Sequence, residues 1–275
     1  MNPHRAPGAY PASLVRSLWV YRQLIFAMTK REVIGRYRGS VMGLAWSFFN
    51  PVLMLAVYTF VFSEVFQSRW AGQDAGKGSF AILLFVGMIV HGLFAECANR
   101  SPSLISANGN YVKKVVFPLE ILPVITLGSA IFHTAISLVV LLVAQFILTH
   151  TLYGSALLFP LILLPLLIAT LGVSWLLAAL GVYLRDVGQV IAVLTTVLLF
   201  LSPVLYPVAA LPQAYQPWLN LNPLTYIIEE SRNVLLFGRL PDWGRLGIAM
   251  LVGMAIAIVG FWFFQKMRKG FADVI

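Results

Sequence analysis

Residues 121–184 read ILPVITLGSAIFHTAISLVVLLVAQFILTHTLYGSALLFPLILLPLLIATLGVSWLLAALGVYL, without one Asp, Glu, Lys or Arg. A membrane-spanning helix needs about 20 predominantly apolar residues, whereas this stretch would extend about 96 Å as a single helix. The stretch must therefore fold back on itself, and HTLYGS at 150–155 is the expected turn. The sequence thus predicts two consecutive spanning helices.

The rest of the chain has the same character. Of its 275 residues, 60% are apolar and 11% charged, against about 25% charged in an average soluble protein. This excludes a soluble globular enzyme and a disordered chain. We predict an all-α polytopic membrane protein with a permease domain over 41–265, an N-terminal segment over 1–40 and a tail over 266–275. The six expected spans cover 41–64, 79–98, 121–148, 156–184, 187–206 and 246–264.

The basic residues orient these spans. With both termini on one side, that side holds 14 of the 19 Lys and Arg residues and the other side holds 5. Positive residues favour cytoplasmic loops, so both termini are predicted to be cytoplasmic. The net charge of +9 is then a consequence of topology, and no nucleic-acid partner is expected. The single cysteine and the scattered histidines predict no metal site.

The segment before the first span has an apolar face at helical spacing, typical of an amphipathic helix in the headgroup plane. Six basic residues accompany it. They fit an ordinary positive-inside anchor, and they equally fit a site for anionic headgroups or phosphate, which arginine binds with paired donors. These candidate headgroup-guiding residues are Arg16, Arg22, Lys30, Arg31, Arg36 and Arg38.

Two longer connections interrupt the apolar pattern. The loop at 99–120 is too polar to span, and we expect a short cytoplasmic helix over 103–107, ended by Asn108-Gly109, that docks a soluble partner. The region 207–242 lies on the opposite side. Asn222 is the expected N-cap of a helix that ends near Gly238, and its length of about 15 residues indicates a re-entrant helix.

Charged side chains within this re-entrant helix, among them Glu229, Glu230 and Arg232, fall off its apolar face, so we expect them on a solvated or interfacial surface. Glu96 and Glu120 lie near span ends, where water or headgroups would hydrate them. His91 and His133 lie within spans, and with no carboxylate expected nearby, neutral hydrogen-bonded side chains are predicted. The absence of an intramembrane carboxylate chain argues against proton coupling.

Aromatic residues gather near the first span and near the re-entrant region. Most such residues are core or interfacial-belt residues, and the alternative is an aromatic-lined conduit on which sugar faces could stack. The candidate channel aromatics are Trp46, Phe49, Tyr58, Phe62, Phe66, Tyr206, Tyr215, Trp218 and Tyr226.

Three motifs carry a resemblance to a known family: REVIGRYRGSVMGLAWSFFNPV at 31–52, KKVVFPLEILPV at 113–124 and NPLTYIIEESRNVLLFG at 222–238. They resemble the permease subunit of type-two ABC exporters, and within that family the branch that exports O-antigen polysaccharide. Related branches export capsular polysaccharide and teichoic acid, which remain the alternatives. A membrane-embedded enzyme acting on lipid-linked sugars and a passive channel are further alternatives, although 121–184 contains no carboxylate for catalysis.

The resemblance implies a half-transporter of the bacterial inner membrane. Two copies would form a homodimeric channel for polysaccharide linked to polyprenyl pyrophosphate. Two copies of a separate ATPase would bind ATP and Mg²⁺, so this chain would carry no cofactor and no catalytic residue. The re-entrant helices and a coupling helix belong to the same pattern. The residues implied to meet the ATPase are Leu104, Ile105, Asn108, Asn110, Tyr111, Lys113 and Lys114.

Overall fold

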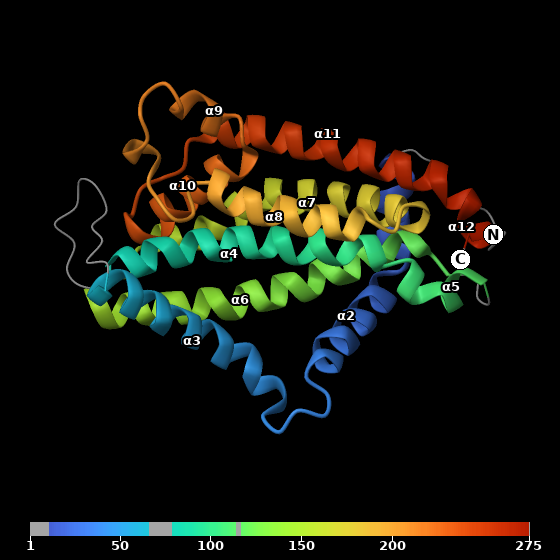
Figure 1. The fold of residues 1–275 in the computed structure, drawn as a ribbon, viewed down its shortest axis with the longest axis horizontal. Coiled ribbons are helices and arrows are strands. Elements are labelled where there is room, and N and C mark those ends of the chain that lie inside the picture. Colours follow the sequence, from blue (N-terminus) through green and yellow to red (C-terminus); the bar gives the residue numbers. More distant parts are fainter. Residues whose placement is uncertain (1–10, 66–78, 114–116, 275) are drawn as a thin grey trace.

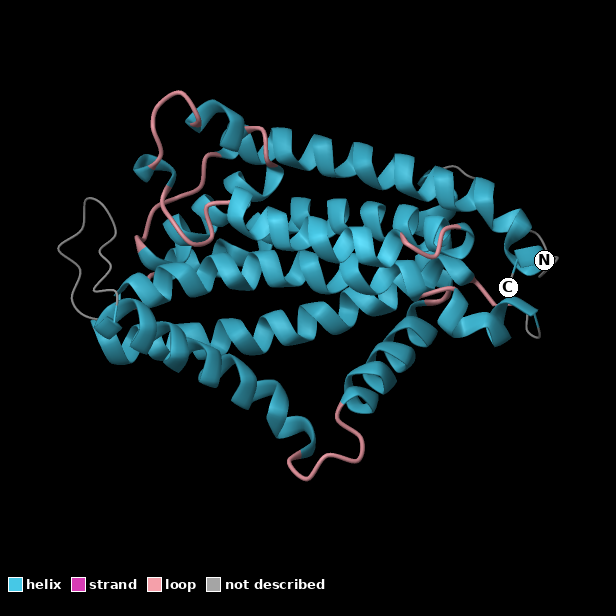
Figure 2. Cartoon of the chain, viewed as in Figure 1, coloured by secondary structure: helices cyan, strands magenta, loops and turns pink. Residues whose placement is uncertain are grey.

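Long apolar helices form most of the computed structural model, which describes residues 11–65, 79–113 and 117–274. These residues form helices and no strands, as Figure 2 shows. Five helical segments are long and apolar enough to cross a membrane, which confirms the predicted helical membrane protein. They centre on α3 (Trp46–Thr59), α4 (Ser79–Arg100), α6 (Leu122–Thr149), α7 (Phe159–Tyr183) and α11 (Trp243–Met267).

The fifth expected span, at 187–206, is shorter than predicted. Helix α8 covers Val187–Leu201, or 15 residues, which corresponds to about 22 Å, below the roughly 30 Å of a bilayer core. Ser202 follows in an extended conformation, with φ −113° and ψ 153°. Pro203 comes next, and the residue before a proline is disfavoured in helical geometry. The helix therefore stops five residues before the predicted end at 206.

The turn between α6 and α7 lies where the sequence predicts it. Helix α6 ends at Thr149, and His150 adopts a left-handed conformation with φ 53°. The 3-10 helix η6 (Gly154–Leu158) then leads into α7. The 64-residue uncharged stretch thus forms two antiparallel helices, α6 and α7 (Figure 1).

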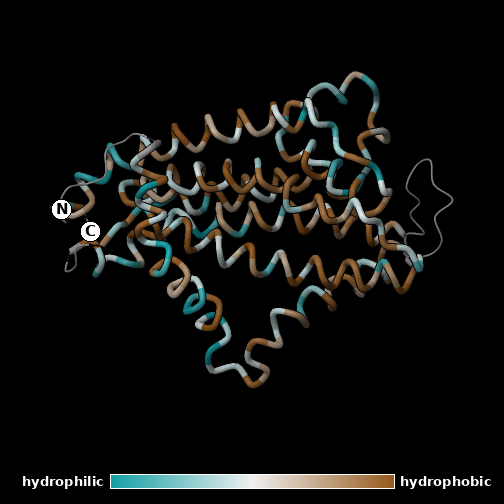
Figure 3. The backbone as a smooth tube through the Cα atoms, turned by 180° about the vertical axis from the view of Figure 1, so that it is seen from behind, coloured by the Kyte–Doolittle hydropathy of each residue, from teal (hydrophilic) through white to brown (hydrophobic). Residues whose placement is uncertain are grey.

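The two ends of the bundle carry different short elements. Figure 1 shows α5 (Gly109–Lys113) and α12 (Phe271–Val274) at one end, called here the coupling end. The opposite, distal end carries α9 (Gln216–Asn220) and α10 (Pro223–Leu236). Hydrophilic residues concentrate towards the ends and along α2, whereas the middle of the bundle is mostly hydrophobic (Figure 3).

The N-terminal helices α1 (Pro11–Val20) and α2 (Arg22–Arg36) precede α3. Helices α2 and α3 form a V that projects from the bundle (Figure 1). Helix α2 packs on α6, where a Cβ atom at Gly128 would lie 2.9 Å from the Thr29 Cγ2. Only 6% of the apolar window over Gly43–Phe62 is buried within the chain, so α3 leaves an extensive apolar surface uncovered.

Helices α7 and α11 pack closely through small residues. A Cβ at Gly260 would lie 2.0 Å from the Gly172 carbonyl oxygen, and one at Gly253 would lie 2.7 Å from the Pro165 carbonyl oxygen. The two contacts are about two helical turns apart on both helices. Small residues drive association of membrane helices by allowing backbones to approach, so these glycines fix how α11 lies on α7.

Substituting Gly260 with alanine tests this packing. Because the added methyl group meets a backbone oxygen that cannot rotate away, we expect Gly260→Ala to destabilise the detergent-purified protein by about 1–3 kcal/mol or more. Thermal unfolding monitored by intrinsic fluorescence measures the change. The matched control is Gly247→Ala on the same helix, where nothing lies within 4 Å of the added Cβ. Equal melting temperatures for both variants would contradict the packing account.

Candidate functional site

The connection between α4 and α6 differs in detail from the predicted helix over 103–107. It begins with the 3-10 helices η3 (Ser101–Ser103) and η4 (Ser106–Asn108). Helix α5 follows, so Gly109 starts a helix rather than ending one. We call residues 101–113 the coupling segment.

Close backbone contact fixes the coupling segment to α7. A Cβ at Gly181 would lie 2.0 Å from the Pro102 carbonyl oxygen. Ile105 is fully buried and packs in the apolar cluster with Trp175 and Phe264. Ile105 therefore anchors the segment and offers no surface to a partner.

The other residues predicted to meet an ATPase lie closer to the surface. Asn110 is exposed, whereas Leu104, Asn108 and Tyr111 are half-buried. Tyr111 stacks on Phe117 with ring centroids 4.5 Å apart. The backbone of Lys113 ends α5, and Lys114 lies outside the described residues. The exposed part of the segment is therefore centred on Ser106, Ala107 and Asn110.

Glu120, in the 3-10 helix η5 (Leu119–Ile121) that leads into α6, links three other parts of the chain. Glu120 has no exposed surface. Ser17 Oγ on α1 donates a hydrogen bond of 2.9 Å to Glu120 Oε1, and Arg268 Nη1 beyond α11 donates one of 2.7 Å to Oε2. Trp175 Nε1 on α7 donates to the Glu120 carbonyl oxygen at 2.9 Å. The expectation of a hydrated Glu120 is wrong, because protein donors replace water around it.

A second charged cluster joins α2 to α4 and α6. Arg36 pairs with Glu96, and Arg100 pairs with both Glu32 and Glu96. His133 Nδ1 lies 3.3 Å from Glu96 Oε2. The expectation of no carboxylate near His133 is wrong, because α4 and α6 pack side by side and bring Glu96 and His133 together.

Two of the six candidate headgroup-guiding residues make contacts within the chain. Arg36 is held by Glu96, and Arg22 donates to the Trp19 carbonyl oxygen while its guanidinium lies over the Trp19 ring. The remaining four side chains are exposed on α1, α2 and the turn that follows α2. They are Arg16, Lys30, Arg31 and Arg38.

At the distal end, α10 begins at the predicted cap. The Asn222 side chain accepts a hydrogen bond of 3.0 Å from the Leu224 N–H, and Pro223 is the first helical residue. Gly238, just past the end of the helix, has φ +67°, which favours glycine. These observations confirm the predicted helix.

Two of the three charged residues of α10 are not on a solvated face as expected, whereas the Glu229 side chain is 42% exposed. Arg232 is only 3% exposed and Glu230 only 8% exposed. Arg232 Nε donates to the Leu83 carbonyl oxygen and Nη2 to the Val204 carbonyl oxygen, both at 3.0 Å. Arg232 thus links α10 to α4 and to the turn after α8, and Glu229 lies 3.6 Å from its Nη1.

A glycine on α4 makes room for this guanidinium. A Cβ at Gly87 would lie 3.1 Å from Arg232 Nη2 and 3.0 Å from the Val204 Cα. No local signal in α10 indicates this arrangement, because the acceptors come from residues 149 and 28 positions away.

The candidate channel aromatics do not converge within one chain. Trp46 and Phe49 are exposed on α3, Tyr58 packs against the core and Phe62 stacks on Phe80. Phe66 lies outside the described residues. At the distal end, Tyr215 and Trp218 are exposed, whereas the hydroxyl groups of Tyr206 and Tyr226 donate to backbone carbonyl oxygens. The described members therefore come from two parts of the chain, α3 with the turn that follows it, and residues 206–226 at the distal end.

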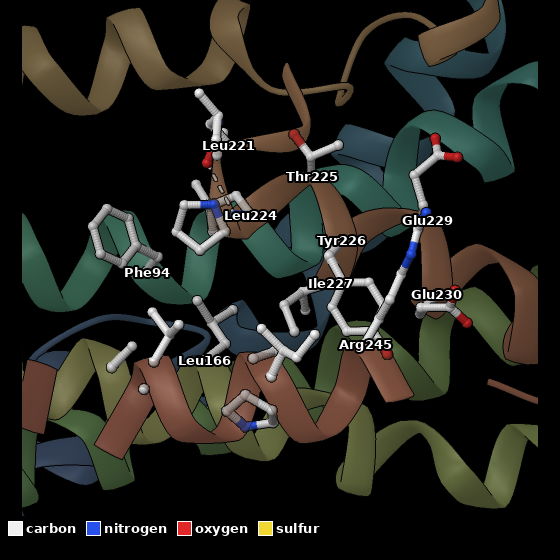
Figure 4. Close-up of a pocket in the computed structure, with 18 of the residues that line it drawn as sticks. Phe94, Leu166, Leu221, Leu224, Thr225, Tyr226, Ile227, Glu229, Glu230 and Arg245 are labelled. Atoms are coloured by element: carbon white, nitrogen blue, oxygen red, sulfur yellow. Dashed lines mark hydrogen bonds between the residues drawn. The ribbon is translucent and has the colours of Figure 1, made fainter. Parts of the chain in front are cut away.

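A cavity of about 710 Å³ lies between α7, α8, α10 and α11. Figure 4 shows its lining, with Phe94, Leu166 and Leu224 at one end and Glu229, Glu230 and Arg245 at the other. Its dimensions and its mixed lining suit an amphiphilic ligand. Among the described residues, no group of His, Cys, Asp and Glu side chains could hold a metal ion.

Comparison with known proteins gives a consistent result. The family model described as "ABC-2 type transporter" matches residues 23–236. The O-antigen export system permease protein RfbA of Myxococcus xanthus is 30% identical over 95% of this chain and 99% of its own length. A protein of the same name from Klebsiella pneumoniae is 26% identical over 92% of this chain and 95% of its own. The polysialic acid transport protein KpsM of Escherichia coli is 21% identical over 91% and 95%.

We expect Glu120→Gln to loosen the coupling end without unfolding the bundle. The neutral amide accepts more weakly from Ser17 and Arg268, and a charge-assisted hydrogen bond contributes about 1.5–3 kcal/mol. Hydrogen exchange of residues 11–20 and 268–274 should therefore become about ten times faster or more. Asp273→Asn, at an exposed side chain in α12, is the control and should leave exchange unchanged. Unchanged exchange in Glu120→Gln would remove the proposed role of this carboxylate.

Arg232→Met should destabilise the distal end. The variant keeps much of the side-chain volume but loses two charge-assisted hydrogen bonds of about 1.5–3 kcal/mol each. We expect a clear fall in the melting temperature of the purified protein and faster exchange in α10. Arg239→Met, which removes an exposed arginine just past α10, should change neither. A melting temperature of Arg232→Met equal to that of Arg239→Met would contradict the structural role of the buried guanidinium.

Proposed function

The chain belongs to the ABC-2 type transporter family, and on that premise we propose that it exports O-antigen polysaccharide on a lipid carrier, driven by a separate ATPase. The observation that carries the proposal is similarity over nearly the full length of both proteins to an O-antigen export system permease. The several long apolar helices make this chain a multi-pass protein of the inner membrane.

The comparison favours O-antigen over capsular polysaccharide as cargo. Identity to the O-antigen permeases is 25–30%, and to the polysialic acid transport proteins it is 21%. Capsular polysaccharide is therefore the second candidate.

We propose that the ATPase docks on the coupling segment. Its exposed centre at Ser106, Ala107 and Asn110 offers a contact surface, while Ile105 and the Pro102–Gly181 contact hold its base against α7. A push on the segment would therefore move α7 rather than bend a loose loop. ATP and Mg²⁺ would be bound by the ATPase.

Glu120 would transmit the same push further. It is hydrogen-bonded to α1 through Ser17 and to the C-terminal segment through Arg268. In this proposal the N-terminal helices move with the coupling segment as one unit. The exposed Arg16, Lys30, Arg31 and Arg38 on those helices and the adjoining turn would guide the anionic pyrophosphate of the carrier, since arginine and lysine bind phosphate oxygens.

A second copy of the chain would complete the channel. Helix α3 leaves its apolar surface uncovered within one chain, and Trp46 and Phe49 are exposed on it. Two such surfaces would face each other in a homodimer. The aromatic rings would then offer flat, apolar contacts along which a sugar chain could slide.

Substitutions on the coupling segment test the proposal in cells. A strain lacking the chain should lose surface O-antigen and accumulate lipid-linked O-antigen inside the inner membrane. Ala107→Arg and Asn110→Arg should restore the protein to the membrane but lower surface O-antigen at least tenfold, because a bulky charge disrupts the ATPase contact. Immunoblotting of extracted lipopolysaccharide gives the measurement.

The control is Gln213→Arg, at an exposed position of the distal end, which should export normally. Failure of the chain to co-purify with an ATPase, or full export by both coupling-segment variants, would contradict the proposal. Loss of capsule with intact O-antigen in the deletion strain would transfer the assignment to the second candidate.

A further inference from the structure

The cavity at the distal end has a long apolar body. Side chains from five helices line it, including Phe94 of α4, Leu166 and Val173 of α7, and Leu198 of α8. Along α11 the lining runs from Arg245 to Ile256, a distance of about 16 Å along the helix axis. The cavity is partly enclosed, so its shape suits a flexible hydrocarbon chain that enters from one side.

Charged residues lie at one end of this body only. Glu229, Glu230 and Arg245 are grouped there, across the lining from Phe94 and Leu166 (Figure 4). Glu229 lies beside the buried Arg232, and Arg245 Nε lies 3.6 Å from Asp242 Oδ2 while its side chain is 69% exposed. This end therefore offers both carboxylate acceptors and a cationic donor at the surface.

Glu230 distinguishes this end from an ordinary charged surface. The residue is more than nine-tenths buried, and its Oε2 atom has no hydrogen-bond partner among the described residues. A buried carboxylate oxygen without a donor is costly, and a ligand that brings an N–H donor would remove that cost. Glu230 is among the residues that line the cavity, so its carboxylate borders the space in which a ligand headgroup would lie.

We propose that this cavity binds an aminophospholipid, with the chemistry of phosphatidylethanolamine. One acyl chain lies in the apolar body between α7, α8 and α11. The primary ammonium group donates to Glu230, and the phosphate lies against the guanidinium of Arg245. The lipid thereby fills the space behind α10 and holds this helix against α7 and α11.

The charged residues of the site favour an aminophospholipid over the proposed transported substrate. A pyrophosphate-linked carrier has an anionic headgroup, which the neighbouring Glu229 and Glu230 repel. A quaternary ammonium has no N–H to donate to Oε2, so a choline lipid loses the hydrogen bond that an ethanolamine lipid makes. The test of this site therefore does not depend on the identity of the cargo.

Native mass spectrometry of the detergent-purified full chain tests the proposal. The delipidated protein is titrated with dioleoyl phosphatidylethanolamine, phosphatidylcholine or phosphatidylglycerol. We expect one ethanolamine lipid per chain to bind about tenfold more tightly than the other two, consistent with one charge-assisted hydrogen bond. Glu230→Gln should abolish this preference. Asp186→Asn, in the exposed loop between α7 and α8 and outside the cavity lining, should retain it.

A second pair of variants tests the apolar body independently of the headgroup. Val252 lines the cavity and Val259 does not, although both are exposed on α11. Val252→Phe should lower binding of the ethanolamine lipid at least fivefold, and Val259→Phe should not. The proposal is overturned by equal binding of the three lipids, by preference for phosphatidylglycerol, or by unchanged selectivity in Glu230→Gln.

Discussion

Lipid hydrocarbon supplies no hydrogen bonds, and this constraint governs where the few charges of the chain can lie. Two buried charges, one at each end of the bundle, are satisfied by protein groups. Glu120 receives hydrogen bonds from Ser17 and Arg268, and Arg232 donates to the carbonyl oxygens of Leu83 and Val204. Because these partners lie on other helices or on the turns that follow them, satisfying the charges also fixes these elements to one another at both ends of the bundle.

Between these two charged ends, packing depends on backbone proximity. Glycines at 172, 253 and 260 let α7 and α11 approach until carbonyl oxygens meet Cα atoms. Helix α7 also supports the coupling segment through Gly181 at one end and borders the distal cavity at the other. It is therefore the element through which a force applied at the coupling end would reach α10 and α11.

Local sequence signals predicted the elements well where the deciding residues are neighbours. The uncharged stretch over 121–184 and the turn at 150–155 followed from composition and helix length, and Asn222-Pro223 marked the start of α10. The early end of α8 was missed, although Ser202-Pro203 carries a signal for it. The predicted end at 206 is based on apolar composition alone, and apolar composition does not indicate where a helix ends.

The charge network was not predictable from the sequence, because its partners are distant along the chain. Glu120 and Arg268 are 148 residues apart, and His133 and Glu96 are 37 apart. A helical wheel places Arg232 off the apolar face of α10, but it cannot show that carbonyl oxygens of α4 and of the turn after α8 lie opposite. Only the packing of α10 against those elements makes burial of the guanidinium favourable.

The central claim is that energy from a separate ATPase moves a lipid-linked polysaccharide through a pair of these chains. Its most direct test reconstitutes the purified chain with its ATPase in proteoliposomes that contain lipid-linked O-antigen, and measures antigen accessible to antibody on the far side. The account predicts translocation that requires both ATP and the ATPase. Translocation by the chain alone, or ATP hydrolysis by the complex with no translocation of O-antigen, would contradict it.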